Sequence, residues 1–330
     1  MTSSTHTSLY PTQVESNKPT KSAAVGHQPL QHPSKVGKIF NDTMTTSSDM
    51  LSRRVKLSNG LTTPQIHLGL YMMSGPETTR AVRAALAIGY RGFDCAQWYY
   101  NEREAGAAIR AFIAASSNTP VTRDDIFYTT KLRDNSTSYD AVRASIRRSV
   151  AACGLGHVDL FLLHSPCGGR EARLASWRAV EDAVLEGQVT MGGVSNYGPR
   201  HVEELMASGP RVRPVVNQIE VHPFNTQTAI RDVCAKHGIV VEAYAPLARA
   251  MRFGHPTVVE MSRAYECTPA QLLVRWSIQH GFVTLPKSVK QERLVSNADV
   301  GGFDISNQDM EILDGLDEKF VTDWDPTDAP

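Results

Sequence analysis

The sequence predicts an α/β protein whose main part is a (β/α)8 barrel of the TIM type, and three observations lead to this class. After residue 53, short apolar runs alternate with segments of helical periodicity, which is typical of a parallel sheet covered by helices. The alternation gives eight strands, a number that favours closure into a barrel. A doubly wound sheet is the structural alternative, but no Gly-x-Gly-x-x-Gly follows the first strand.

Residues 1–52 differ in composition from the rest of the chain. They are rich in Ser, Thr, Lys, His and Pro and carry few aromatic or branched apolar side chains. Such a segment cannot bury enough apolar surface to offset the entropy of ordering. We therefore expect a disordered extension over 1–52 and one barrel domain over 53–330. The extension lacks the patterns of a secretory signal or a transit peptide, and a targeting or regulatory role is the alternative to a plain tail.

The first element after the extension is a β-hairpin over 53–64, expected to cap the barrel, because two strand-like runs flank Asn59-Gly60. The barrel strands are expected at 66–69, 89–94, 125–131, 157–164, 190–196, 214–220, 238–246 and 281–287. Helices are expected at 78–89, 102–115, 138–154, 172–187, 201–209, 226–238 and 268–281, and several of these end on Gly, a common helix stop.

Composition and charge argue against several classes of partner. The chain has 34 basic and 34 acidic residues and a formal net charge of zero, so nothing predicts binding to nucleic acid or to an anionic membrane. No apolar run approaches the ~20 residues that cross a bilayer. The five cysteines are widely spaced without a Cys-x-x-Cys pair. This indicates reduced thiols in a cytoplasmic protein, and neither a disulfide framework nor a metal site is expected.

Polar residues stand where the apolar strands end. In a parallel barrel all carboxyl-terminal strand ends meet at one rim, which carries the active site. One polar residue at a strand end is usually only the start of a loop, but a whole converging set favours a functional site. The residues of this set are Asp94, Lys131, His164, Ser195, Asn196, Gln218, Glu220, Tyr244 and Lys287.

The segment GFDCAQWYYNE (92–102) raises the question of why an acid follows a buried run. A buried carboxylate costs several kcal/mol unless it is paired, so Asp94 requires a positive partner, and a phenol close by suggests proton chemistry. Each residue also has a simpler interpretation. Asp94 could be the N-cap of the next helix, Lys131 a solvated loop residue, and His164 a hydrogen-bonded histidine of the barrel.

Seven segments, GFDCAQWYYNE, TTKL, FLLHSP, GVSNY, NQIEVHP, AYAPL and LPKSVKQERLVSN, closely resemble, in order and spacing, the signature segments of the aldo-keto reductases. The resemblance covers about residues 53 to 325. It implies NADPH-dependent reduction of an aldehyde or ketone to the alcohol, with a catalytic tetrad of Asp94, Tyr99, Lys131 and His164. A monomer is the family's default and a dimer is the alternative.

The chemistry of the tetrad follows from the residue types. Tyrosine, with a pKa near 10, is a poor acid at neutral pH, and an adjacent Lys131 ammonium is expected to lower the pKa of Tyr99 so that it acts as general acid. Asp94 would hold Lys131, and His164 would donate a hydrogen bond to the substrate carbonyl. Tyr100 competes for the acid role, but the family's Asp-x-x-x-x-Tyr spacing selects Tyr99.

The resemblance also implies the cofactor contacts. Ser195, Asn196 and Gln218 would hold the nicotinamide carboxamide, and Tyr244 would stack on the ring. Lys287, Ser288 and Arg293 suit a 2′-phosphate, which favours NADPH over NADH; a solvated basic turn is the alternative. Asn297 resembles an adenine contact, and the set is completed by Leu247 and Val289.

The sequence departs from the family pattern at several positions. Ser296 replaces a glutamate beside the adenine contact, and Ala245 replaces a serine that contacts the pyrophosphate. In PQIHLGLY (64–71), His67, Leu70 and Tyr71 stand where glycine, threonine and tryptophan are usual. These three replacements are expected to change the shape of the pocket and to loosen one cofactor contact.

The substrate pocket is expected to be lined by Tyr71, Trp98 and His164, with Trp324 as a secondary candidate. The loops after His164 and Tyr244 are short, which suggests an open, shallow site. This resembles small-substrate members such as diketogluconate and glyoxal-type reductases. An alternative of another class is an NADPH-binding, redox-sensing subunit with little turnover. A phosphate-binding or aldolase-like barrel would need a late glycine-rich phosphate loop, and none is visible.

Overall fold

The computed structural model describes residues 47–116 and 120–330. Within them, eight strands form one sheet in which each strand pairs in parallel with the next along the chain. The strands are β3 (His67–Gly69), β4 (Gly92–Asp94), β5 (Phe127–Leu132), β6 (Val158–Leu163), β7 (Val189–Ser195), β8 (Val216–Glu220), β9 (Val240–Tyr244) and β10 (Val283–Leu285). Each overlaps the range that the sequence predicts for it.

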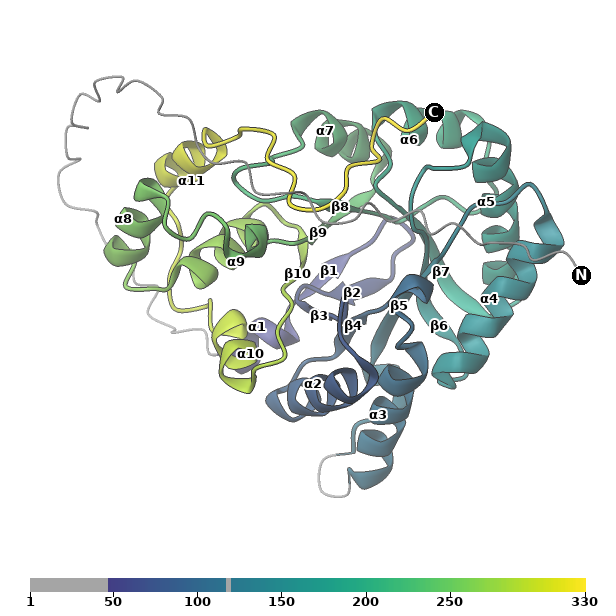
Figure 1. Ribbon diagram of the computed structural model, residues 1–330, viewed down its shortest axis with the longest axis horizontal. Helices are drawn as coiled ribbons and strands as arrows, with labels where there is room; N and C mark the ends of the chain where they lie inside the picture. Colours follow the sequence, from purple (N-terminus) through teal and green to yellow (C-terminus); the bar gives the residue numbers. More distant parts are fainter. Residues whose placement is uncertain (1–46, 117–119) are drawn as a thin grey trace, which may run out of the picture. The chain divides into compact units, whose positions relative to one another are not determined.

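The last strand, β10, returns to the first, β3, and closes the sheet into a barrel. The closing contacts are a parallel bridge between Ile66 and Thr284 and two backbone hydrogen bonds. Thr284 N donates to Gln65 O at 2.9 Å, and Gly69 N donates to Pro286 O at 3.3 Å. Figure 1 shows the strands at the centre with the helices around them. The predicted (β/α)8 barrel is confirmed.

Helices follow the barrel strands in turn. They are α2 (Gly75–Ile88), α3 (Glu102–Ala115), α4 (Tyr139–Cys153), α5 (Gly169–Leu185), α6 (Pro199–Ala207), α7 (Thr228–His237), α8 (Pro256–Ala264), α9 (Pro269–Gln279), α10 (Gln291–Ala298) and α11 (Asn307–Asp314). The seven predicted helices are all present. Three further helices, α8, α10 and α11, are not among the predicted ranges, and they are only nine, eight and eight residues long.

Local sequence signals set the helix ends. The Ser138 hydroxyl accepts from the Ala141 backbone N–H before α4, which satisfies one of the free donors of the first turn. At the other end, Gly89, Gly154 and Gly238 follow α2, α4 and α7 with positive φ angles of 119°, 63° and 68°. Glycine adopts this left-handed conformation without steric cost, so it ends these helices sharply.

Side chains alternate between the two faces of each barrel strand. On β6, Leu160 and Leu162 belong to the interior cluster, whereas Phe161 and Leu163 pack in the larger core that also contains the helix side chains. The same alternation sends every second residue of the other strands into the barrel. The register places Asp94, Lys131 and Gln218 on the inward face near the carboxyl-terminal rim.

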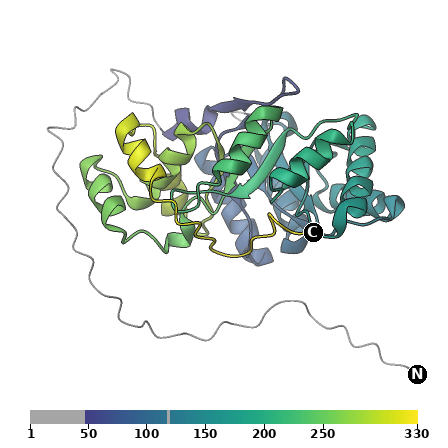
Figure 2. The ribbon, with the colours of Figure 1, turned by 90° about the horizontal axis from the view of Figure 1, so that it is seen from above.

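The hairpin lies at the opposite end of the barrel. Its strands, β1 (Arg54–Lys56) and β2 (Thr62–Pro64), pair antiparallel. Leu57, the residue after β1, joins the interior cluster of the barrel. Figure 2 shows the hairpin and the yellow C-terminal segment on opposite sides of the barrel. The predicted hairpin cap is thus present at the end remote from the candidate site.

A short helix, α1 (Ser47–Ser52), precedes the hairpin. Met50 and Leu51 are buried in the main core, so the prediction that the disordered extension continues to residue 52 is wrong for 47–52. The physical reason is that these two apolar side chains bury enough surface to dock the turn. The prediction for 1–46 lies outside the described residues.

His67 also differs from expectation. It lies at the amino-terminal end of β3, where its Nε2 is 2.9 Å from Thr63 Oγ1 and its ring contacts Phe127. A Cβ at Gly92 would lie 2.3 Å from His67 Cδ2, so this glycine makes room for the imidazole. Burial lowers the pKa of His67 to about 3. The residue packs the hairpin end as a neutral ring, and the expectation that it shapes the substrate pocket is wrong.

Residues 47–116 and 120–330 hold neither a membrane-spanning helix nor a metal cluster. No helix there is long and apolar enough to span a bilayer. No group of three or more His, Cys, Asp or Glu side chains there is placed to hold a metal ion. The five cysteines are free thiols.

Candidate active site

Lys131 is the centre of the candidate site. It lies on β5 with only 1% of its surface exposed, and its ammonium donates to Asp94 Oδ2 at 2.7 Å. The same Nζ donates to the Cys95 carbonyl at 2.9 Å and to the Tyr99 hydroxyl at 3.1 Å. Asp94 is buried as well. The buried carboxylate therefore has the positive partner that it requires, and that partner contacts a phenol.

A short 3₁₀ turn, η1 (Gln97–Tyr99), ends at the first of the two neighbouring tyrosines, and Tyr100 is its C-cap. Tyr99 points inward, with its ring centroid 5.8 Å from that of His164. Tyr100 has a positive φ of 54° and is 75% exposed, and its hydroxyl accepts from Arg133 Nη1 at 3.2 Å. The structure thus brings Tyr99 to Lys131 and turns Tyr100 to the surface.

The direction of the Tyr99 pKa shift differs from the expectation. Burial raises the pKa of the Tyr99 hydroxyl well above its ordinary value, and the Asp94 carboxylate raises it further. The expected decrease of this pKa by the Lys131 ammonium is wrong, because desolvation outweighs the nearby charge. At neutral pH the phenol therefore holds its proton.

His164 follows β6 at the rim and is nearly buried. Its ring centroid lies 5.0 Å from that of Trp98. Burial lowers the pKa of His164 well below its ordinary value, and the Lys131 charge adds to the decrease. Its Nδ1 is buried without a hydrogen-bond partner among the described residues. A neutral imidazole can donate one hydrogen bond without bringing a second cation into the site.

The predicted nicotinamide contacts form one connected network. Ser195 Oγ donates to the Gln218 carbonyl at 2.8 Å. Asn196, which has a positive φ of 60°, donates from Nδ2 to the His164 carbonyl at 3.0 Å and accepts from the Tyr244 hydroxyl at 2.9 Å. The strands β7, β8 and β9 thereby fix two amides and an aromatic ring beside the tetrad, an arrangement that fits a flat heteroaromatic ring with a carboxamide.

The remaining predicted cofactor residues lie on two segments. Around the start of α10, Lys287, Val289 and Arg293 are exposed, whereas Ser288 and Asn297 are buried. The Ser288 hydroxyl accepts from the Lys290 backbone N–H at 3.0 Å, which fixes the turn. Leu247 lies on the other segment, after β9, and is partly buried against the core. Two exposed cations at a helix N-terminus fit a phosphate.

Aromatic side chains surround the tetrad at the rim. The ring of Tyr71 is centred 5.1 Å from that of Tyr99, and Trp98 lies between His164 and Trp324, 5.8 Å from the latter. The structure thus brings the three predicted pocket residues and the secondary candidate, Trp324, to the same part of the rim.

The C-terminal segment crosses this rim and adds a residue that the sequence analysis missed. Asp323 Oδ2 accepts from the Tyr71 hydroxyl at 3.0 Å and from Arg249 Nη2 at 2.6 Å. Glu220 Oε1 accepts from the Thr322 backbone N–H at 2.8 Å, which holds the segment to the end of β8. No local pattern could identify Asp323, because its contacts depend on the path of the chain end.

Glu242 is a second residue that the sequence analysis missed, and here a signal was visible. It interrupts the apolar run GIVVEAYAP, and it is fully buried on β9. Gln218 Nε2 donates both to Glu242 Oε2 at 2.9 Å and to Asp94 Oδ1 at 2.8 Å. The carboxyl of Glu242 is therefore linked to the tetrad through one amide.

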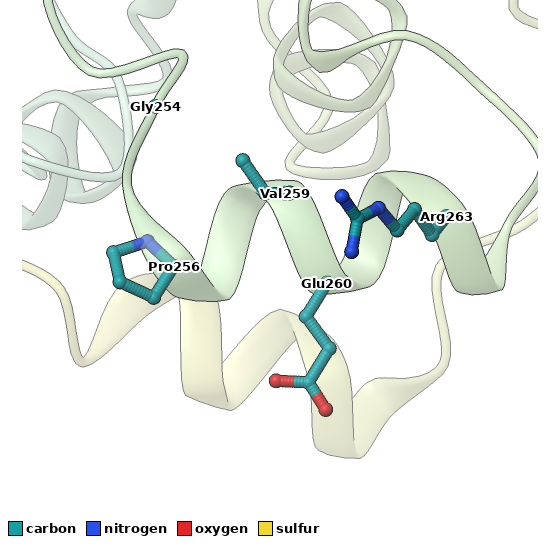
Figure 3. Close-up of a pocket in the computed structure, with 5 residues that line it drawn as sticks. All are labelled: Gly254, Pro256, Val259, Glu260 and Arg263. Carbon is teal, nitrogen blue, oxygen red and sulfur yellow. The ribbon is translucent and has the colours of Figure 1, made fainter.

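A surface hollow of about 460 Å³ lies against α8, lined by Gly254, Pro256, Val259, Glu260 and Arg263. None of these residues belongs to the candidate site. Figure 3 shows Val259 and Glu260 pointing to different sides of the helix. Because its side chains do not converge on a common point, the hollow does not compete with the rim as the functional site.

The closed parallel barrel, with a buried lysine–aspartate pair beside a tyrosine and a histidine at its carboxyl-terminal rim, defines a (β/α)8-barrel enzyme. Residues 61–318 match the family described as the aldo/keto reductase family, and the chain belongs to this family. An uncharacterised oxidoreductase of Schizosaccharomyces pombe is 45% identical over 281 residues, which cover 85% of this chain and 100% of the relative.

Two further relatives carry more specific descriptions. The glyoxal reductase of Bacillus subtilis is 35% identical over 269 residues, which cover 81% of this chain and 94% of the relative. The crystal structure of an aldo-keto reductase from Bombyx mori, described in complex with NADP, superposes with a TM-score of 0.76 at 30% identity, covering 82% of this chain and 94% of that one. The family and these names identify the chain as an oxidoreductase.

Proposed function

We propose that this protein reduces an aldehyde or ketone to the alcohol with NADPH, and that Tyr99 is the general acid. The observation that carries the proposal is the position of the Lys131 ammonium, 2.7 Å from Asp94 Oδ2 and 3.1 Å from the Tyr99 hydroxyl, at the rim of a barrel of this family. A proton donor, a cation that stabilises its conjugate base and a carboxylate that holds the cation are what carbonyl reduction requires from the protein.

NADPH is the cofactor of this proposal, and it supplies the hydride when it is bound. The amides of Asn196 and Gln218 and the hydroxyl of Ser195 would hold the carboxamide, with Tyr244 against the ring. The exposed Lys287 and Arg293 would hold the 2′-phosphate at the start of α10. The description of the Bombyx mori relative in complex with NADP supports the same choice.

The residues of the chain then act in a defined order. His164, neutral because its pKa is lowered by burial, donates a hydrogen bond to the carbonyl oxygen and orients it. As negative charge develops on that oxygen, the Tyr99 hydroxyl transfers its proton to it. The Lys131 ammonium stabilises the resulting phenolate, and Asp94 keeps the ammonium in place. The proton of Tyr99 and the ammonium of Lys131 act on negative charge that develops only during the reaction.

Small carbonyl compounds are the substrate class that the rim supports. Only a short connection separates the end of β6 from the start of α5, and the pocket walls are the rings of Tyr71, Trp98 and Trp324. Flat or compact carbonyls fit between such rings. The name of the Bacillus subtilis relative, glyoxal reductase, points to the same class.

The direct test is whether the purified full chain oxidises NADPH in the presence of glyoxal or benzaldehyde. The readout is the loss of NADPH absorbance. We expect turnover with at least one of the two, and the alcohol as product. NADPH binding without turnover of either compound would contradict the proposal and favour the redox-sensing alternative. Binding is measured separately by quenching of tryptophan fluorescence.

The basic residues at α10 give a prediction about cofactor choice. Replacing Arg293 by alanine removes one cation from the proposed 2′-phosphate site, so KM for NADPH should rise about 10- to 100-fold, the range of a lost charge-assisted hydrogen bond. KM for NADH, which lacks this phosphate, should stay nearly constant. Arg263→Ala, which removes an exposed arginine from α8, is the control for loss of charge. An equal rise of KM for both cofactors in Arg293→Ala would remove Arg293 from the phosphate site.

A further inference from the structure

Glu242 is a buried acid that the proposed reaction does not use. It lies on the inward face of β9, two residues before Tyr244, and none of its surface is exposed. One carboxyl oxygen accepts from Gln218, and the other, Oε1, has no hydrogen-bond partner among the described residues. A half-satisfied carboxyl group in a barrel interior is costly. A hydrophobic residue would stabilise this position more, which suggests a role other than stability.

Glu242 stands at one end of a continuous chain of hydrogen bonds that ends at the proton donor. Parallel pairing sets Gln218 directly beside Glu242, and Gln218 Nε2 bridges Glu242 Oε2 and Asp94 Oδ1 at 2.9 and 2.8 Å. The other oxygen of Asp94 accepts from Lys131, which contacts the Tyr99 hydroxyl. Any change at Glu242 therefore reaches the tetrad through one amide.

The two carboxyl groups determine which end of the Gln218 amide faces into the barrel. Both contacts of the amide are made by its nitrogen, which is a donor, to oxygens that act as acceptors. A flipped amide would place its own oxygen against these oxygens. With the nitrogen so engaged, the amide oxygen is the atom left to accept from the carboxamide N–H of a nicotinamide.

We propose that Glu242 is a positioning residue for carbonyl reduction: through Gln218 it fixes the amide that receives the nicotinamide and supports Asp94 against Lys131. This inference rests on the proposed function. Its action is indirect, because Glu242 reaches Asp94 only through Gln218 and does not bond the Tyr99 hydroxyl.

The charge of Glu242 makes this role dependent on pH. The pKa of its carboxyl is raised to about 7, mainly by burial and also by the Asp94 charge. The hydrogen bond from Gln218 and the Lys131 charge act in the opposite direction. The groups that face Glu242 are thus Asp94 from β4, Lys131 from β5 and the neutral amide of Gln218 from β8. Below pH 7 the set carries one buried negative and one positive charge, and above pH 7 Glu242 adds a second negative charge.

The test measures NADPH affinity and the pH profile in Glu242→Gln, which keeps the shape of the side chain but cannot ionise. We expect the dissociation constant for NADPH to rise about tenfold, because the glutamine offers Gln218 only a neutral acceptor and can turn its own NH2 toward the Gln218 amide nitrogen. An inflection near pH 7 in the wild-type kcat profile should disappear. Glu181→Gln is the matched control, because Glu181 is also buried, on α5, but accepts from the Val212 backbone N–H and from Arg211 outside the site. It should change neither value.

A double-mutant cycle covers the case in which Glu242→Gln perturbs folding. Gln218→Met removes the bridge, so adding Glu242→Gln to it should leave NADPH affinity unchanged from that of Gln218→Met alone. Additive losses, or wild-type affinity and pH profile in Glu242→Gln, would overturn the proposal. The affinity readout needs no turnover, so a failure of the proposed function is seen separately, as NADPH binding without oxidation.

Discussion

Replacing Tyr99 by phenylalanine should lower kcat by about 100- to 10,000-fold, the range for loss of a general acid, and leave NADPH binding intact. The hydroxyl is the group that contacts the Lys131 ammonium at 3.1 Å. The ring keeps its neighbours, Tyr71 and His164, because phenylalanine has the same shape without the oxygen. The loss should therefore lie in proton transfer and not in the structure of the pocket.

The neighbouring tyrosine is the matched control for this variant. Tyr100→Phe removes the same atom one position further on, where the side chain is exposed and its hydroxyl contacts only Arg133 among the described residues. We expect its turnover to match wild type. The measurements are steady-state NADPH oxidation and NADPH affinity by fluorescence quenching for both variants. If Tyr99→Phe retained full turnover, or if Tyr100→Phe lost it, the acid would not be Tyr99.

The features of the fold and site that could be predicted are those that local sequence patterns determine. The barrel strands could be predicted because each is a short apolar run bounded by helical periodicity. The convergence of Asp94, Lys131 and His164 followed from one rule, that parallel strand ends meet at one rim. The spacing that favours Tyr99 over Tyr100 is local too. In the structure η1 ends at Tyr99, and the positive φ of Tyr100 turns the two rings in different directions.

Contacts that depend on the path of the whole chain could not be predicted in this way. Tyr71 and Asp323 are 252 positions apart, and nothing near either residue indicates the other. Glu242 was visible as a charge in an apolar strand, but its link to Asp94 depends on the register of β8 and β9 and on the side chain between them. The predicted direction of the Tyr99 pKa shift was wrong for a related reason. Burial of Tyr99 in the folded site outweighs the charge of Lys131, and this burial cannot be seen in the sequence.

Lys131→Met should have the largest combined effect, because it removes the cation that supports Tyr99 and leaves a buried carboxylate without its charge partner. Asp94 and Lys131 are 4% and 1% exposed. Removing one member of such a pair destabilises a protein by about 3–5 kcal/mol, whereas a surface pair contributes at most about 1 kcal/mol. We expect a clear fall in the free energy of unfolding, measured by chemical denaturation, together with loss of turnover comparable to that of Tyr99→Phe. Lys236→Met, which breaks an exposed pair with Glu203, is the control.

The double variant Asp94→Asn with Lys131→Met separates the two effects. It removes both charges of the pair, so neither residue is left as an ion without its partner, and most of the lost stability should return when it is measured below pH 7, where Glu242 is neutral. Turnover should not return, because the Tyr99 phenolate formed during proton transfer still has no ammonium beside it. Recovery of activity together with stability would mean that Lys131 acts only by balancing Asp94. Stability without activity would instead identify stabilisation of the Tyr99 phenolate as the function of the lysine, for which the buried aspartate is the necessary counter-charge.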